Sequence, residues 1–290
     1  MLKSVLITAV AASSVYFLFF FIRDVLTNRA ALKNENIPNV PLAIYTFILY
    51  FLASFGIPDF ALSSAVYKKT AWVDDRLLPG TLVSESVVPV AAMAVGYLSF
   101  VEIDALTLVL PIIAQIIGCV IGARFTLRIS VKAIRRCVNI GLIVAVAMIV
   151  LSKISFVSAS GDNICLRGWP MALCLIVSFV GGFLNNIGIG SFSVMMALFS
   201  FLGLSSVVAY PVMMCAAAIS VPVGSVEFIK HGVYKMKPCL FSSVFGILGV
   251  VLAITVVKAL NTSALQWIVA FVLLYSAFSS MLSSKRDGSV

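Results

Sequence analysis

The chain has 290 residues, of which 62% are hydrophobic and 11% charged, and its formal net charge is +9. This composition excludes an ordinary soluble domain, which would expose far more charge, and it indicates an all-α polytopic membrane protein. The positive charge does not indicate a nucleic-acid-binding protein, because the lysines and arginines stand in short gaps between apolar runs, as in cytoplasmic loops.

Apolar runs long enough to cross a bilayer recur along the chain. The first covers residues 4–22, and it continues well beyond Ala11 and Ala12, which favours a retained helix over a cleaved signal peptide. Two shorter segments, 60–67 and 191–204, follow glycine-containing breaks and are typical of the second arms of broken or re-entrant helices. The other predicted spans are 40–56, 80–99, 105–123, 137–152, 170–187, 207–228, 238–257 and 263–282.

The two breaks, FGIPDF at 55–60 and IGIGSF at 187–192, belong to a weak internal repeat. Identical residues recur at an offset of 131 or 132 positions, which indicates duplication of one unit. The matching pairs are Gly56 and Gly188, Ile57 and Ile189, Phe60 and Phe192, Pro79 and Pro211, and Gly118 and Gly249.

Loop charges indicate that the two copies are inverted. The loop before the last span of the first copy, 124–136, is strongly basic, whereas the loop before it carries Glu102 and Asp104. In the second copy the basic loop, 230–237, comes one span earlier. Equivalent loops are therefore expected on opposite sides of the membrane, which predicts two inverted repeats.

The expected organisation follows from these loops. An extra N-terminal transmembrane helix and its cytoplasmic loop occupy 1–39, the first repeat 40–153, an extracytoplasmic linker 154–168 and the second repeat 169–290. Each repeat is expected to contain a broken or re-entrant helix and three spanning helices. The positive-inside rule then predicts a plasma-membrane protein whose N-terminus is outside and whose C-terminus is cytoplasmic.

A broken helix at membrane depth leaves backbone groups that are tolerated only inside protein or along a hydrated cavity. Inverted repeats with discontinuous helices are typical of secondary transporters, and the helix N-termini after the breaks suit a small anion. The alternative is that glycine and serine only allow close helix packing. The predicted substrate-binding residues are Gly56, Ile57, Pro58, Asp59, Ser63, Ser64, Asn185, Asn186, Gly188, Ile189, Gly190, Ser191 and Ser193.

Two carboxylic acids within apolar segments, Asp59 and Glu85, are the predicted coupling residues. Ionised carboxylates are costly in hydrocarbon, so either is a candidate carrier for a coupling proton or cation. The alternatives are a Glu85 that extends to the interface and an Asp59 that caps the following helix. Of Asn185 and Asn186, one is expected to line the cavity and the other to form an interhelical hydrogen bond. We expect no catalytic residues, cofactor or metal, because the six cysteines lack metal-binding spacing and His231 stands alone.

Three motifs resemble the TauE/SafE sulfite exporter family: DDRLLPGTL at 74–82, GCVIGARF at 118–125 before a basic loop, and YPVMM at 210–214. The resemblance covers nearly everything after residue 40. It implies a permease for sulfite, a sulfonate such as sulfoacetate, or a related small organic anion, coupled to an ion gradient. The glycine-rich breaks of the family correspond to Gly56, Ile57, Pro58 and Asp59 and to Gly188, Ile189, Gly190 and Ser191.

The first break departs from the family pattern, because it reads GIPDF where the form closer to the family is GIGSF. A carboxylate beside an anionic substrate favours proton symport or a less anionic substrate. Two alternatives to a carrier remain, an anion channel and a non-transporting scaffold or assembly factor. An enzyme is not expected. The sequence contains no Walker motif, so ATP-driven transport by this chain is not expected either. The sequence gives no indication of the oligomeric state.

Overall fold

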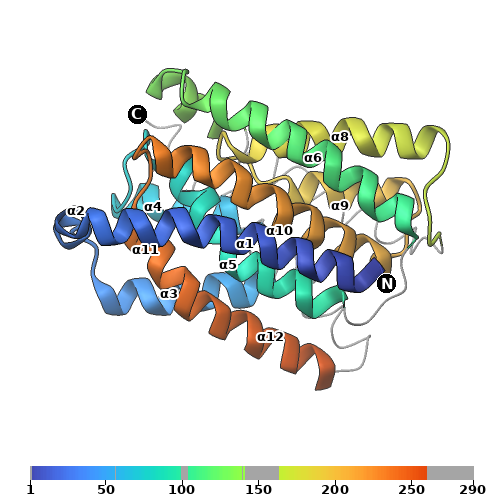
Figure 1. The fold of residues 1–290 in the computed structure, drawn as a ribbon, viewed down its shortest axis with the longest axis horizontal. Helices are drawn as coiled ribbons and strands as arrows, with labels where there is room; N and C mark the ends of the chain where they lie inside the picture. Colours follow the sequence, from blue (N-terminus) through green and yellow to red (C-terminus); the bar gives the residue numbers. More distant parts are fainter. Residues whose placement is uncertain (1, 56, 99–103, 139, 141–162, 260–290) are drawn as a thin grey trace.

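The computed structural model describes residues 2–55, 57–98, 104–138, 140 and 163–259. This part of the chain is a bundle of helices running along one long axis (Figure 1). All of the predicted span 263–282, most of the predicted span 137–152 and most of the linker 154–168 lie outside the described residues. The helices are α1 (Leu2–Thr27), α2 (Arg29–Asn34), α3 (Asn39–Ala53), α4 (Asp59–Thr70), α5 (Leu78–Leu98), α6 (Ala105–Thr126), α8 (Trp169–Asn185), α9 (Phe192–Phe201), α10 (Ser206–Lys230), α11 (Met236–Phe241), the π-helical turn η1 (Ser242–Gly246) and α12 (Ile247–Ala259).

Five helical segments within the described residues are long and apolar enough to cross a membrane. Two shorter apolar helices, α3 and α8, end at the two breaks. These lengths and compositions support the predicted multi-pass, all-helical membrane protein. The five segments are Lys3–Thr27, Leu78–Leu98, Ala105–Thr126, Val208–Lys230 and Met236–Val256.

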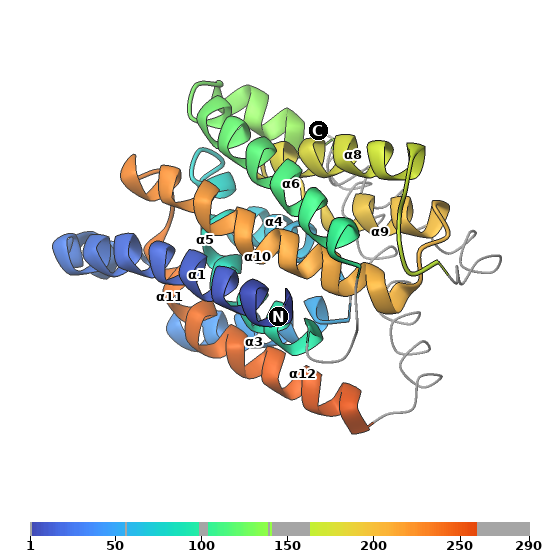
Figure 2. The same cartoon turned by 45° about the vertical axis from the view of Figure 1, so that its right-hand side comes forward.

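Glycines allow two pairs of helices to pack closely. A Cβ atom built on Gly118 of α6 would lie 1.9 Å from the carbonyl oxygen of Phe179 in α8, and one on Gly249 of α12 would lie 2.2 Å from that of Phe47 in α3. Figures 1 and 2 show α6 beside α8 and α12 beside α3 in both views. Backbones approach this closely only where a side chain is missing, as is usual for small residues in membrane helices.

Prolines inside two helices free carbonyl groups that neighbouring serines then use. Pro89 has no N–H for the carbonyl of Glu85, four residues earlier, and this carbonyl accepts a 2.7 Å hydrogen bond from Ser242 Oγ of η1. Pro222 similarly leaves the carbonyl group of Ala218 in α10 without its usual helical donor. This carbonyl accepts a 3.1 Å hydrogen bond from Ser13 Oγ of α1. These bonds fix η1 against α5 and the N-terminal helix against α10.

The basic loops gather at one end of the bundle. Arg135 Nη2 lies 2.6 Å from Asp75 Oδ2, and Arg124 Nε lies 3.5 Å from Glu227 Oε1. The carboxylate of Glu35 accepts hydrogen bonds from the backbone N–H groups of Met236 and Lys237, each 2.8 Å long. The loops predicted to be cytoplasmic are thus neighbours in space.

Candidate functional site

The first break lies between α3, which ends at Ala53, and α4, which begins at Asp59. Pro58 precedes α4 with φ −65° and ψ 102°, an extended conformation that separates the two helices. The hydroxyl of Tyr97 donates a hydrogen bond to the carbonyl oxygen of Ser54 and so provides a partner for one backbone group of the break. The predicted interruption is confirmed; Gly56 itself lies outside the described residues.

The second break lies between α8, which ends at Asn185, and α9, which begins at Phe192. Gly188 has a φ of +94°, which side-chain-bearing residues rarely adopt, so glycine suits the turn at this position. The side-chain oxygen of Asn185 accepts a 2.7 Å hydrogen bond from the backbone N–H of Ser191. Asn185 therefore joins the two sides of the second break. The predicted interruption of the helix is confirmed here too.

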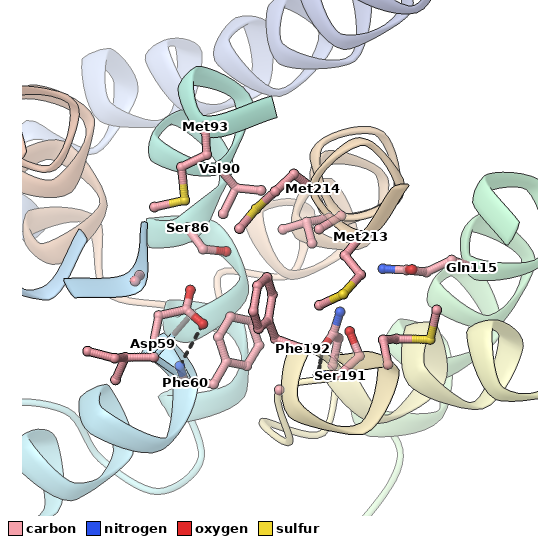
Figure 3. Close-up of a pocket in the computed structure, with 17 residues that line it drawn as sticks. Asp59, Phe60, Ser86, Val90, Met93, Gln115, Ser191, Phe192, Met213 and Met214 are labelled. Carbon is pink, nitrogen blue, oxygen red and sulfur yellow. Dashed lines mark hydrogen bonds between the residues drawn. The ribbon is translucent and has the colours of Figure 1, made fainter. Parts of the chain in front are cut away.

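The two breaks meet in the middle of the bundle. A Cβ atom on Gly190 would lie 3.2 Å from Cβ of Phe60, so the backbone of the second break touches the first turn of α4. A cavity of about 50 Å³ lies between the breaks, with further walls from α5, α6 and α10 (Figure 3). Its lining residues are Ala53, Ile57, Asp59, Phe60, Ser86, Val90, Met93, Gln115, Asn185, Gly190, Ser191, Phe192, Met195, Met213, Met214, Ala217 and Val221.

Polar groups reach this cavity from both breaks and from α6. Figure 3 shows Asp59 on the α4 side and Ser191 and Gln115 on the other, with the rings of Phe60 and Phe192 between them. Gln115 is 2% exposed, and its amide forms no hydrogen bond with any described residue. Among the described lining residues there is no lysine or arginine. An anion bound here would be held by N–H groups, hydroxyls and amides.

Asp59 has two roles in its position. Its Oδ1 accepts a 2.9 Å hydrogen bond from the backbone N–H of Phe60, so it satisfies one free donor in the first turn of α4. The same residue lines the cavity. Asp59 therefore both lines the cavity and accepts a hydrogen bond within the first turn of α4, whose N-cap residue is Pro58.

Asn185 and Asn186 divide as expected. Asn185 lines the cavity, whereas the Asn186 amide nitrogen donates to the carbonyl oxygens of Cys119 in α6, at 3.1 Å, and of Gly182, at 2.9 Å. A Cβ atom on Gly224 of α10 would lie 2.4 Å from Asn186 Oδ1. Asn186 thus links α8 to α6 close to α10.

Several predicted site residues lie outside the cavity wall. Glu85 contacts Tyr67 of α4, whereas its neighbour Ser86 lines the cavity. The two side chains differ in direction because successive residues of an α-helix are rotated by about 100°. Ser63 accepts a hydrogen bond from Tyr45 at 2.8 Å. Pro58, Ser64, Gly188 and Ile189 are likewise absent from the described wall. Ser193 belongs to α9, but its side chain is not among those described.

Sequence reasoning missed the contributions of α5, α6 and α10. Ser86 stands in a long apolar helix, where a serine is common. Gln115 is the only amide side chain in the predicted span 105–123, and this signal could have indicated it. Met93, Met195, Met213 and Met214 supply much of the remaining wall. Their flexible, polarisable side chains adapt to irregular space. On α10, the lining residues Met213, Ala217 and Val221 are spaced four residues apart, which places them on one helix face. This spacing could have indicated a common surface.

Comparison with known families gives one match: residues 171–289 match the family described as Sulfite exporter TauE/SafE. The matched region begins in α8 and includes the second break, α9, α10 and α12. The resemblance seen in the motifs is confirmed for this part of the chain, and the family indicates a membrane transporter. Comparisons with curated proteins and with solved structures find no match.

Proposed function

We propose that the protein is a secondary transporter that binds a small anion in the cavity between the two breaks. The observation that carries this proposal is that α4 and α9 both begin at the wall of one cavity. Helix N-termini carry partial positive charge and free N–H groups, which favour an anion. The Gln115 amide, which has no hydrogen-bond partner among the described residues, supplies a further donor in a wall whose described residues include no lysine or arginine.

The substrate class is sulfite, a sulfonate or a related small organic anion. The family match supports it, as do the neutral donors at the second break. A cavity of about 50 Å³ suits a compact group. Asp59 would repel an anion when ionised, so we propose that it is protonated when substrate binds. Either Asp59 or Glu85 then links transport to a proton or another cation.

Two inverted repeats, 40–153 and 169–290, would move against each other to open the site to each side in turn. The close contacts of Gly118 with Phe179 and of Gly249 with Phe47 support this proposal. Gly118 and Gly249 are related by an offset of 131, and Phe47 and Phe179 by one of 132, so the same contact is made twice with the repeats exchanged. We further propose a plasma-membrane location with the basic loops in the cytoplasm.

A carrier is favoured over an anion channel because the cavity is small and its wall is mostly apolar. A channel would need a continuous polar path. A scaffold would not require two helix breaks that meet at a cavity, nor a buried amide there that has no hydrogen-bond partner among the described residues.

Flux measurements in proteoliposomes test the proposal. Sulfite and small sulfonates should enter saturably under an imposed pH gradient. Replacing Gln115 with Leu should raise KM about tenfold, since a hydrogen bond to a charged group is lost. Ile113→Leu, on the exposed face of the same helix, is the matched control and should behave as the wild type. Absence of saturable flux for every such anion would overturn the assignment.

A further inference from the structure

A second polar site lies beside the cavity, around the carboxyl group of Glu85. Glu85 is 1% exposed in the middle of α5. The hydroxyl of Tyr67, from α4, donates a hydrogen bond to its Oε2. The Ser63 hydroxyl also interacts with this carboxyl group and accepts a 2.8 Å hydrogen bond from Tyr45 of α3. Helix α4 therefore supplies two hydroxyl groups to one buried carboxyl group, and α3 supplies a third that donates to Ser63.

No cation balances this carboxyl group within the described residues. The three ion pairs found there join Arg124 to Glu227, Arg135 to Asp75 and Arg167 to Asp104. The titratable side chains that interact with Glu85 are acidic or neutral: Tyr45 and Tyr50 of α3, Asp59 and Tyr67 of α4, and Cys239 of α11. A buried carboxylate without a counter-charge is strongly unfavourable, and proton uptake removes its charge.

Tyr50 provides a further observation. It is fully buried, its hydroxyl has no hydrogen-bond partner among the described residues, and its side chain lies in the neighbourhood of Glu85. Buried hydroxyls normally have partners. The Tyr50 hydroxyl therefore adds a hydrogen-bonding group without a described partner to the region around Glu85.

Helix α4 connects this region to the cavity. Asp59 lines the cavity at the N-terminus of α4, and Tyr67 contacts Glu85 eight residues later, about 12 Å along the helix axis. The helix packs on α3 and α5, the helices that carry Tyr45 and Glu85. A change in the hydrogen bonds at Tyr67 or Ser63 would therefore shift a helix whose other end forms part of the cavity wall.

We propose that Glu85, Tyr67, Ser63 and Tyr45 form a proton-binding site separate from the cavity, and that this site carries the proton that drives transport. The carboxyl O–H bond of Glu85 forms when the site opens to one side, and it breaks when the proton leaves to water on the other side. Tyr67 is a positioning residue that ties this exchange to α4. The role in transport rests on the proposed function, but the proton site itself does not.

Infrared difference spectroscopy of the purified full-length protein tests the site without any transport. A pH step should reveal bands of protonated carboxyl groups, one of which is lost in Glu85→Gln, shifted in Tyr67→Phe and retained in Asp59→Asn. Tyr16→Phe, which removes a hydroxyl from an exposed side chain of α1, is the matched control and should leave the band in place. If no band is lost in Glu85→Gln, or if the band lost there is unchanged in Tyr67→Phe, the proposal is overturned. A band displaced by Na⁺ at constant pH would also overturn it, in favour of a cation site.

Two transport assays separate this proposal from the proposed function. With sulfite as the probe, Glu85→Gln should keep exchange between equal concentrations on both sides and lose accumulation driven by a pH gradient. Gradient-driven accumulation at the wild-type level would contradict the coupling role. Absence of all sulfite flux in the wild-type protein would remove the transport proposal, while the infrared result would still decide the proton site.

Discussion

Gly190 of the second break lies against Phe60 of the first, so closely that a Cβ atom at Gly190 would be 3.2 Å from Cβ of Phe60. This contact joins segments more than a hundred residues apart in the chain. It also forms part of the cavity wall, since both residues line it.

Enlarging Gly190 should therefore obstruct the cavity. Alanine requires Phe60 to move by a few tenths of an ångström and should have a small effect, whereas valine should reduce flux about tenfold or more, as expected for overpacking. Flux and thermal unfolding measured together check this. Gly96→Ala is the control, because its Cβ would meet only the movable end of Ile254. Full activity in Gly190→Val would mean that the substrate does not pass between the breaks.

Asp59→Asn should separate the two roles of Asp59. The asparagine oxygen can still accept the hydrogen bond from the Phe60 N–H, so α4 should keep its first turn, but the side chain no longer ionises. We expect the KM for sulfite to lose its pH dependence. Asp59→Ala should in addition lower the stability by about 1 kcal/mol through loss of the hydrogen bond to the Phe60 N–H. If KM in Asp59→Asn varies with pH as in the wild type, Asp59 serves only the first turn of α4.

The breaks and their polar residues were predictable because glycine, proline and asparagine are unusual in an apolar run. The division between Asn185 and Asn186 was also anticipated, though not which of them would line the cavity. The rest of the wall depends on tertiary structure: Ser86 and Gln115 acquire a role only because α5 and α6 turn those faces toward the breaks. Glu85 was singled out from its charge, but the helix phase that directs it toward Tyr67 could not be assigned without knowing where α4 lies.

The proposed inverted repeat predicts equivalent behaviour at two distant glycines. Gly118→Ala and Gly249→Ala should each destabilise the protein by about 1–3 kcal/mol, because the new methyl group would collide with the backbone of Phe179 or Phe47. On helix propensity alone, replacing glycine with alanine would stabilise the protein. Destabilisation would therefore indicate the collision with the neighbouring backbone. Thermal unfolding of both variants, again beside Gly96→Ala, checks the prediction. Stabilisation in either variant would contradict the close contact.

A surface contact should respond to acid. The Arg167 guanidinium, and then the Thr107 N–H, hold the pKa of Asp104 well below its usual range; Arg167 Nη2 lies 2.6 Å from Asp104 Oδ1. Because the pKa is lower in the folded protein, this contact stabilises at neutral pH, and its contribution is lost as pH falls below about 4. Asp104→Asn should lower the unfolding temperature at pH 7 and reduce the difference between pH 7 and pH 3. An unchanged difference would show that the contact does not stabilise the fold.

A structure determined with bound sulfite or a small sulfonate tests the central claim most directly. The account predicts ligand density between the two breaks, within hydrogen-bonding distance of the Gln115 amide and the first turn of α9, and loss of that density in Gln115→Leu. Density at another place in a protein that transports the same anion saturably would contradict it.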